Sequence, residues 1–197
     1  MPRREIQFSP GHYYHAFNRG AGRAPIFFRP DDYQYCRRLL ERNQVDYQVQ
    51  VISYCLMPNH YHLLLRQDGE QPISDYIAAV FNPYVQSVNK QQGRHGTLFQ
   101  GRFRARWVAD EAYLDRVSCY IHANPLVAGL ITANGHWPYS NLAEWVGKIS
   151  SSLWDRDFVQ TRFPESADYL AFLDEYLANR AILPSVWRAY LDWLTYS

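Results

Sequence analysis

The amino-acid sequence predicts an α+β fold in which helices pack on a single antiparallel sheet. Three observations lead to this prediction. A Pro58-Asn59 turn separates two runs of strand-forming residues, several segments carry apolar residues at helical spacing, and strands alternate with helices along most of the chain. With 197 residues, of which 47% are hydrophobic and 20% charged, the chain is long enough to bury a core.

The first half of the chain contains three predicted strands and one helix. Residues 12–18, HYYHAFN, have the aromatic-rich character of a strand, and a glycine-containing loop follows them. Residues 29–44 are expected to form a helix, because aspartates can cap its start and its apolar residues share one stripe. Residues 47–56, YQVQVISYCL, form the clearest strand, and residues 60–66, HYHLLLR, return antiparallel to it.

A second helix and a fourth strand follow this hairpin. Residues 73–91 carry apolar side chains at helical spacing, although Pro83 should kink or split that helix. In residues 102–108, RFRARWV, polar and apolar residues alternate strictly. Such a strand places its three arginines on one face and Phe103, Ala105 and Trp107 on the other.

A third helix is expected over residues 110–125, with an acidic first turn and an end near Pro125. The order strand, helix, strand, strand, helix, strand, helix is typical of a ferredoxin-like antiparallel sheet with packed helices. We therefore expect a domain over residues 1–147 and a helical C-terminal extension over residues 148–197. The helices expected in that extension span residues 166–180 and 184–195.

Charge is unevenly distributed, although the formal net charge is only +1. Residues 1–107 carry fourteen Lys or Arg against eight Asp or Glu, whereas residues 108–197 carry six against eleven. Eighteen of the twenty cationic side chains are arginine, which suits bidentate contact with phosphate. This pattern favours a polyanion-binding front half followed by an acidic tail.

Three cysteines without C-x-x-C spacing predict neither a disulfide framework nor a cysteine-only zinc site. No run approaches eighteen apolar residues, and the first fifteen residues lack the apolar core of a signal peptide. The sequence therefore predicts a cytoplasmic protein that does not enter a membrane.

The stretch MPNHYHLLL places His60 and His62 two residues apart on a predicted strand. Side chains alternate along a strand, so both imidazoles project from one face about 7 Å apart and can converge on one ion. Surface or core histidines explain the same spacing, which is common by chance. The pair alone is a weak signal for a metal.

The third predicted helix adds Tyr120 and Asn124, which are one turn apart and share one helical face. Two imidazoles and an amide oxygen leave positions around Mg²⁺ or Mn²⁺ open for phosphate oxygens. Tyr120 could then attack phosphorus and form a phosphotyrosine. Tyr113 lies on about the same stripe, Tyr84 is a further candidate, and a core tyrosine remains the ordinary alternative.

A zinc module is the main rival from another class of function. Cys55, His60, His62 and Cys119 could supply four ligands for a structural zinc ion. Against this hypothesis, Cys119 and Tyr120 point about 100° apart on a helix, so both cannot face the histidines.

Several blocks of the chain resemble the single-tyrosine transposases of the HUH endonuclease superfamily, and within it the REP-associated tyrosine transposases. MPNHYHLLL is similar to the family's histidine strand, and YIHANPLVAGL is similar to the helix that carries its tyrosine. FNRG and WPYSNLAEW are similar to flanking blocks, in the same order, over roughly residues 10–147.

The resemblance implies an HUH nuclease fold in which His60, His62 and Asn124 bind Mg²⁺ or Mn²⁺ and Tyr120 is the nucleophile. It implies nicking and joining of single-stranded or hairpin DNA next to palindromes, through a 5′-phosphotyrosine, by a monomer rather than a dimer. A protein that binds the same hairpins without cutting them is the alternative. A DNA-binding protein is expected to be more basic than this chain, which has few lysines and an acidic tail. The affinity for DNA is therefore left open.

Arginines on residues 102–108 are spaced by about 7 Å, close to the phosphate repeat of an extended single strand. They could follow a DNA backbone or form only the solvated face of an edge strand. Lys90 and Arg94 precede them in a loop, and the first loop offers further contacts. The expected DNA-binding residues are Asn18, Arg19, Lys90, Arg94, Arg102, Arg104 and Arg106.

Overall fold

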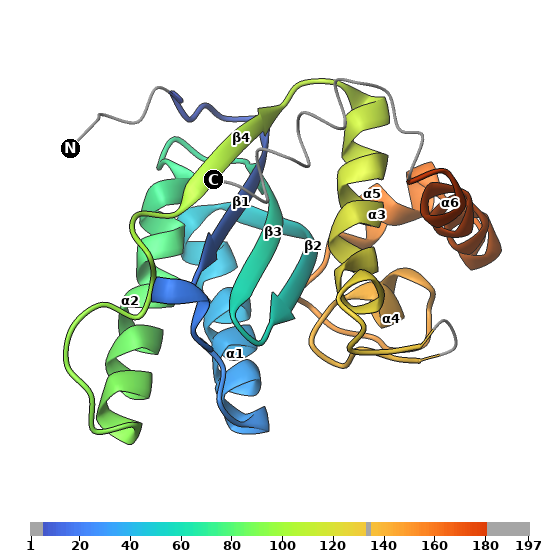
Figure 1. The fold of residues 1–197 in the computed structure, drawn as a ribbon. Coiled ribbons are helices and arrows are strands. Elements are labelled where there is room, and N and C mark those ends of the chain that lie inside the picture. The colour runs from blue at the N-terminus through green and yellow to red at the C-terminus, as the bar shows by residue number, and fades with distance from the viewer. Residues whose placement is uncertain (1–5, 133–134, 181–197) are drawn as a thin grey trace.

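The computed structural model describes residues 6–132 and 135–180, in which one four-stranded sheet carries helices on both faces (Figure 1). Neighbouring strands are antiparallel in the order β2-β3-β1-β4, so β3 lies between β1 and β2. This arrangement confirms the predicted α+β, ferredoxin-like sheet. The elements are β1 (Tyr13–Arg19), η1 (Ala21–Arg23), α1 (Pro30–Tyr47), β2 (Val49–Met57), β3 (His60–Gln67), α2 (Ile73–Gln91), β4 (Arg104–Val108), α3 (Glu111–Val127), α4 (Leu142–Trp145), α5 (Arg156–Arg162) and α6 (Ser166–Asn179).

Local sequence explains where α1 and α3 begin. Pro30 occupies the first turn of α1, where its missing N–H is not needed. The Asp32 carboxylate accepts two backbone N–H groups just before that helix, at 2.9 and 3.0 Å. Asp110 caps α3, because its carboxylate accepts the N–H of Ala112 at 2.7 Å.

The predicted bounds of the second and third helices are confirmed, whereas the predicted start of the fourth strand is wrong. α2 is not split at Pro83, since its buried apolar face outweighs the one hydrogen bond that a proline removes. α3 ends at Val127, close to the expected end near Pro125, and the hydrogen bond that Pro125 lacks falls in the last turn. β4 begins at Arg104, which leaves Arg102 in the preceding loop. The helix expected over residues 184–195 lies outside the described residues.

The two faces of the sheet bury separate apolar clusters. Alternate side chains of β1 and β3, such as Tyr14 and Leu63, point toward α1 and α2. The other face, with Phe17 and Leu64, packs against α3 and the C-terminal helices. Because the period along a strand is two, His15 and His62 also fall on the α3 face.

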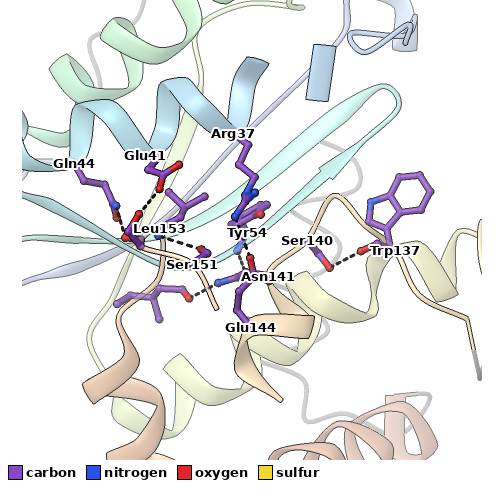
Figure 2. Close-up of polar contacts among 12 residues, drawn as sticks. Arg37, Glu41, Gln44, Tyr54, Trp137, Ser140, Asn141, Glu144, Ser151 and Leu153 are labelled. Atoms are coloured by element: carbon purple, nitrogen blue, oxygen red, sulfur yellow. Dashed lines mark hydrogen bonds and ion pairs between the residues drawn. The ribbon is translucent and has the colours of Figure 1, made fainter. Parts of the chain in front are cut away.

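The segment after α3 is fastened to β2 by a buried asparagine (Figure 2). The Asn141 amide oxygen accepts the backbone N–H of Tyr54 at 2.7 Å, and its amide nitrogen donates to the Ile52 carbonyl at 2.9 Å. The Trp145 indole donates to the same carbonyl at 3.0 Å. These bonds hold α4 beside the sheet and direct the chain toward α3.

α6 packs along α3 and helps to bury the second cluster (Figure 1). Arg162 at the end of α5 binds the Asp115 carboxylate of α3 at 2.5 Å. In the described residues, no helix is long and apolar enough to cross a membrane. The C-terminal helices therefore share a core with the sheet and approach the face that carries the histidines.

Candidate functional site

The β2–β3 hairpin places both histidines of the sequence motif on one face of β3. His60 follows the Pro58-Asn59 turn directly, and His62 lies opposite Phe17 on β1. The imidazole centroids of His60 and His62 are 5.0 Å apart. His60 is half-buried, whereas His62 is buried.

α3 brings Tyr120 and Asn124 to this histidine pair. The Tyr120 hydroxyl lies 3.5 Å from Nε2 of His62, and the two ring centroids are 5.2 Å apart. The Asn124 amide nitrogen donates to the Tyr120 carbonyl at 2.7 Å, and the side chain also hydrogen-bonds with His60. All four residues that the sequence singled out thus meet at one place, although they come from two elements about 60 residues apart.

Each histidine is held through its Nδ1 atom. Nδ1 of His60 lies 2.7 Å from the amide oxygen of Asn59, and Nδ1 of His62 lies 3.0 Å from Nε2 of His15. Such partners fix the orientation and tautomer of metal-binding histidines in known sites. With Nδ1 of His62 engaged by His15, its Nε2 atom faces the Tyr120 hydroxyl and is the ring nitrogen that remains for a ligand.

Burial keeps these imidazoles neutral, which is the form that binds metal ions. Burial lowers the pKa of His60 to about 4, although its hydrogen bond with Asn124 acts in the opposite direction. The pKa of His62 is well below its usual range, because of burial and then the neighbouring His60 and His15. Burial and the nearby Arg106 lower the pKa of His15 to about 3.

Burial raises the pKa of the Tyr120 phenol above its usual range, and a hydrogen bond with Asn124 opposes this effect. The phenol therefore carries its proton at neutral pH. An oxygen nucleophile in such a place needs a nearby positive charge or a proton acceptor to become reactive.

The donor set of His60, His62 and Asn124 fits a small divalent cation. Two imidazole nitrogens and one amide oxygen are a mixed set that Mg²⁺ or Mn²⁺ accepts, with positions left for phosphate oxygens and water. The buried His15 behind His62 is a partner of the kind found at metal-binding histidines, and Asn59 supports the His60 ring in the same way. These three residues are the ones that could hold the metal.

The alternative zinc module has no ligand set among the described residues. Within residues 6–132 and 135–180, no three Cys, His, Asp or Glu side chains are placed to hold a metal ion. Cys55 and Cys119 are buried in the apolar cluster, and burial raises the pKa of both thiols. Cysteines in this environment stay protonated, so they are poor zinc ligands.

A cavity of about 510 Å³ opens over the histidines and Tyr120. Four of the seven residues expected to bind DNA line this cavity, namely Asn18, Arg19, Arg102 and Arg104. Arg106 lies opposite His15 in the pairing of β4 with β1. Lys90 lies in the last turn of α2 rather than in the expected loop, and together with Arg94 in the loop after α2 it lines a separate pocket. That these seven residues bind DNA stays a prediction.

The Asn18 side chain also has a structural role, which the sequence did not indicate. Its amide nitrogen donates to the Gly101 carbonyl at 3.0 Å, and its amide oxygen accepts the N–H of Arg19 at 2.9 Å. Arg19 in turn donates to the Gln100 side chain at 2.5 Å. These bonds join the end of β1 to the loop before β4 and so shape the wall of the cavity.

Sequence reasoning missed four residues at the site. Asn59 and His15 support the two histidines, and Tyr176 and Arg180 line the cavity from the C-terminal helix. The period of two along residues 12–18 could have placed His15 on the face of Phe17. The other contacts depend on tertiary packing and carry no signal in the local sequence.

Comparisons with known proteins give matches among transposases. The family model for IS200-like transposases matches residues 9–124. A protein of Haemophilus influenzae that carries the name REP-associated tyrosine transposase is 25% identical over 105 residues, which cover 48% of this chain and 60% of the relative. The matched region thus spans less than two thirds of that relative.

Two solved structures are among the matches. A REP-associated tyrosine transposase bound to a REP hairpin superposes with a TM-score of 0.63 at 16% identity, covering 79% of this chain and 92% of the other. A transposase from Deinococcus radiodurans R1 gives a TM-score of 0.42 at 16% identity, covering 61% and 95%. At this identity, the first likeness concerns the fold alone.

Proposed function

This chain belongs to the IS200-like transposase family, and from that membership we propose that it nicks and joins single-stranded DNA beside palindromic hairpins. Membership of a transposase family implies cleavage and transfer of DNA strands. The hairpin as substrate is supported by the relative of similar fold, whose structure holds a REP hairpin. Tyr120 is the proposed nucleophile, and a 5′-phosphotyrosine is the proposed intermediate.

One observation carries the proposal. The Tyr120 hydroxyl lies 3.5 Å from Nε2 of His62, at the floor of a cavity that Arg19, Arg102 and Arg104 also line. A phosphodiester that enters this cavity would meet a phenol oxygen, two imidazoles and several guanidinium groups together. Guanidinium groups bind phosphate oxygens through paired hydrogen bonds, so they can hold the strand in register.

The chemistry of the proposed step is an exchange of one phosphoester for another. The Tyr120 oxygen bonds to phosphorus and loses its proton, while the bond from phosphorus to the 3′ oxygen breaks. That oxygen leaves and takes up a proton as a 3′-hydroxyl. The energy of the ester is kept in the phosphotyrosine, so strand joining needs no nucleotide hydrolysis.

His60, His62 and Asn124 would hold Mg²⁺ or Mn²⁺ in this proposal. When bound, the ion would polarise the scissile phosphate and offset its developing negative charge. Asn59 and His15 keep the two imidazoles turned toward Tyr120. Asn124 links the two halves of the site, because it contacts both the Tyr120 backbone and the His60 ring.

Covalent capture of DNA tests the proposal. Purified protein is incubated with single-stranded oligonucleotides that carry a hairpin, with Mn²⁺ or Mg²⁺, and adducts are separated on a denaturing gel. We expect an adduct with the unaltered chain and none with Tyr120→Phe. Tyr113→Phe, on the same helix but outside the cavity, is the matched control and should keep the adduct.

Two outcomes would contradict the proposal in different ways. An adduct that persists in Tyr120→Phe would show that another residue is the nucleophile. Tight binding of the hairpin without any adduct, at all metal concentrations, would instead favour the alternative of a catalytically silent hairpin-binding protein.

A further inference from the structure

The C-terminal helix reaches the proposed active site, although it lies outside the residues that the family model matches. Tyr176 in the last turn of α6 and Arg180 just after it line the same cavity as Tyr120. They are four residues apart, so they lie on one side of the helix. The cavity is thus lined by the sheet and its loops, by α3 and by the end of α6.

Tyr176 has a hydroxyl group that the fold does not explain. The side chain is 6% exposed, and its hydroxyl is buried without a hydrogen-bond partner among residues 6–132 and 135–180. Phenylalanine would fill the same space without the cost of burying an unpartnered hydroxyl. A buried donor that lines a cavity and lacks a partner is therefore available for a ligand.

Arg180 supplies a positive charge close to the same point. It is exposed at the edge of the cavity. Burial is the main cause of the raised pKa of Tyr120; Tyr176 raises this pKa further, whereas Arg180 lowers it. Both side chains are thus within electrostatic reach of the Tyr120 phenol. Burial raises the pKa of Tyr176 itself to about 12, so its hydroxyl remains a donor at neutral pH.

We propose that Tyr176 and Arg180 form a phosphate-binding subsite that holds a backbone phosphate of the DNA strand beside Tyr120. The Tyr176 hydroxyl would donate to a non-bridging oxygen, and the Arg180 guanidinium would neutralise its charge. This subsite rests on the proposed function, since it deepens the description of the same site.

A phosphate is the ligand that this pair selects. An arginine offers only donors, and the protonated Tyr176 hydroxyl adds another, so the ligand must be an acceptor with negative charge. Arg19, Arg102 and Arg104 line the same cavity from the sheet and its loops, so a strand would pass between two cationic walls. Arg180 is one of only six Lys or Arg residues within residues 108–197, and it lies at the cavity where a DNA strand would bind.

Two conservative variants of the full chain test the subsite. Tyr176→Phe removes the hydroxyl and keeps the ring, and Arg180→Gln removes the charge of an exposed residue. Tyr35→Phe and Arg156→Gln are matched controls, because neither residue lines the cavity. A fluorescent single-stranded hairpin oligonucleotide serves as the probe for affinity at several salt concentrations, and adduct formation is timed in parallel. Thermal melting checks that each variant is folded.

We expect each variant to form the adduct about tenfold more slowly, as suits a lost hydrogen bond or charge contact to phosphate. Arg180→Gln should also bind the probe more weakly and lower the salt dependence of its affinity by about 0.7, the value for one phosphate contact on a single strand. The controls should match the unaltered chain.

The subsite is refuted if Arg180→Gln binds the probe and forms the adduct within twofold of the unaltered chain. If Tyr176→Phe forms the adduct within twofold, the Tyr176 hydroxyl does not bind the phosphate and the proposed pair is refuted as well. It is also refuted if an adduct persists in Tyr120→Phe and disappears only when Tyr176→Phe is added, since Tyr176 would then be a nucleophile. Failure of the proposed function is seen separately, because it changes the Tyr120→Phe result or leaves every variant without an adduct. In that last case the affinity and salt arms still decide the subsite.

Discussion

His15 offers a sharp test of how the proposed metal site is supported. Its Nε2 atom lies 3.0 Å from Nδ1 of His62, and both side chains are buried. If His62 binds the metal through Nε2, its Nδ1 must carry the proton and donate it to His15. His15→Leu would then leave a buried N–H group without its acceptor.

The size of the effect follows from that contact. An unsatisfied buried donor costs about 1–3 kcal/mol, and loss of a partner behind a metal-binding histidine weakens metal binding about 10- to 100-fold. We expect the Mn²⁺ concentration for half-maximal adduct formation to rise by that factor in His15→Leu. His15→Gln, whose amide oxygen can accept the same hydrogen bond, should recover most of the loss.

The assay is a Mn²⁺ titration of adduct formation, with circular dichroism to confirm folding. His12→Leu is the matched control, because His12 lies just before the same strand but stacks on the exposed Trp107, away from the cavity. If folded His15→Leu needed no more Mn²⁺ than the unaltered chain, within twofold, the reasoning about His62 would be refuted.

Further predictions concern stability and pH. Asn141→Ala removes the hydrogen bonds to Tyr54 and Ile52, so the free energy of unfolding in urea should fall by about 2–4 kcal/mol; a fall below about 1 would contradict this account. Tyr84→Phe loses a buried bond to a carbonyl and should cost about 1 kcal/mol in the same assay. Burial lowers the pKa of His122 from 6.5 to about 4. The unfolded chain then binds one more proton at this site between those values, so His122 alone should lower the free energy of unfolding by about 3 kcal/mol as pH drops from about 6.5 to 4. Denaturation curves of His122→Gln should show a correspondingly weaker pH dependence, and an unchanged dependence would refute the assignment.

The features that the sequence predicted well are local ones. His60 and His62 share a face because they are two residues apart on a strand, and Tyr120 and Asn124 share a face because they are four apart on a helix. The Pro58-Asn59 turn similarly marks the hairpin. The resemblance to a transposase family supplied the link between the two elements.

Contacts between distant elements could not be read from local patterns. Tyr176 reaches the cavity only because α6 packs along α3, which depends on the buried cluster below both helices. Asn18 was expected to bind DNA. In the structure its side chain also hydrogen-bonds with the loop before β4 and so connects that loop to the end of β1.

Identification of the residue that becomes attached to DNA tests the central claim most directly. The adduct formed with a hairpin oligonucleotide and Mn²⁺ is digested with nuclease and protease, and the nucleotide-bearing peptide is sequenced by mass spectrometry. Our account predicts the phosphate on the oxygen of Tyr120. A phosphate on any other tyrosine, or on a histidine, would contradict it.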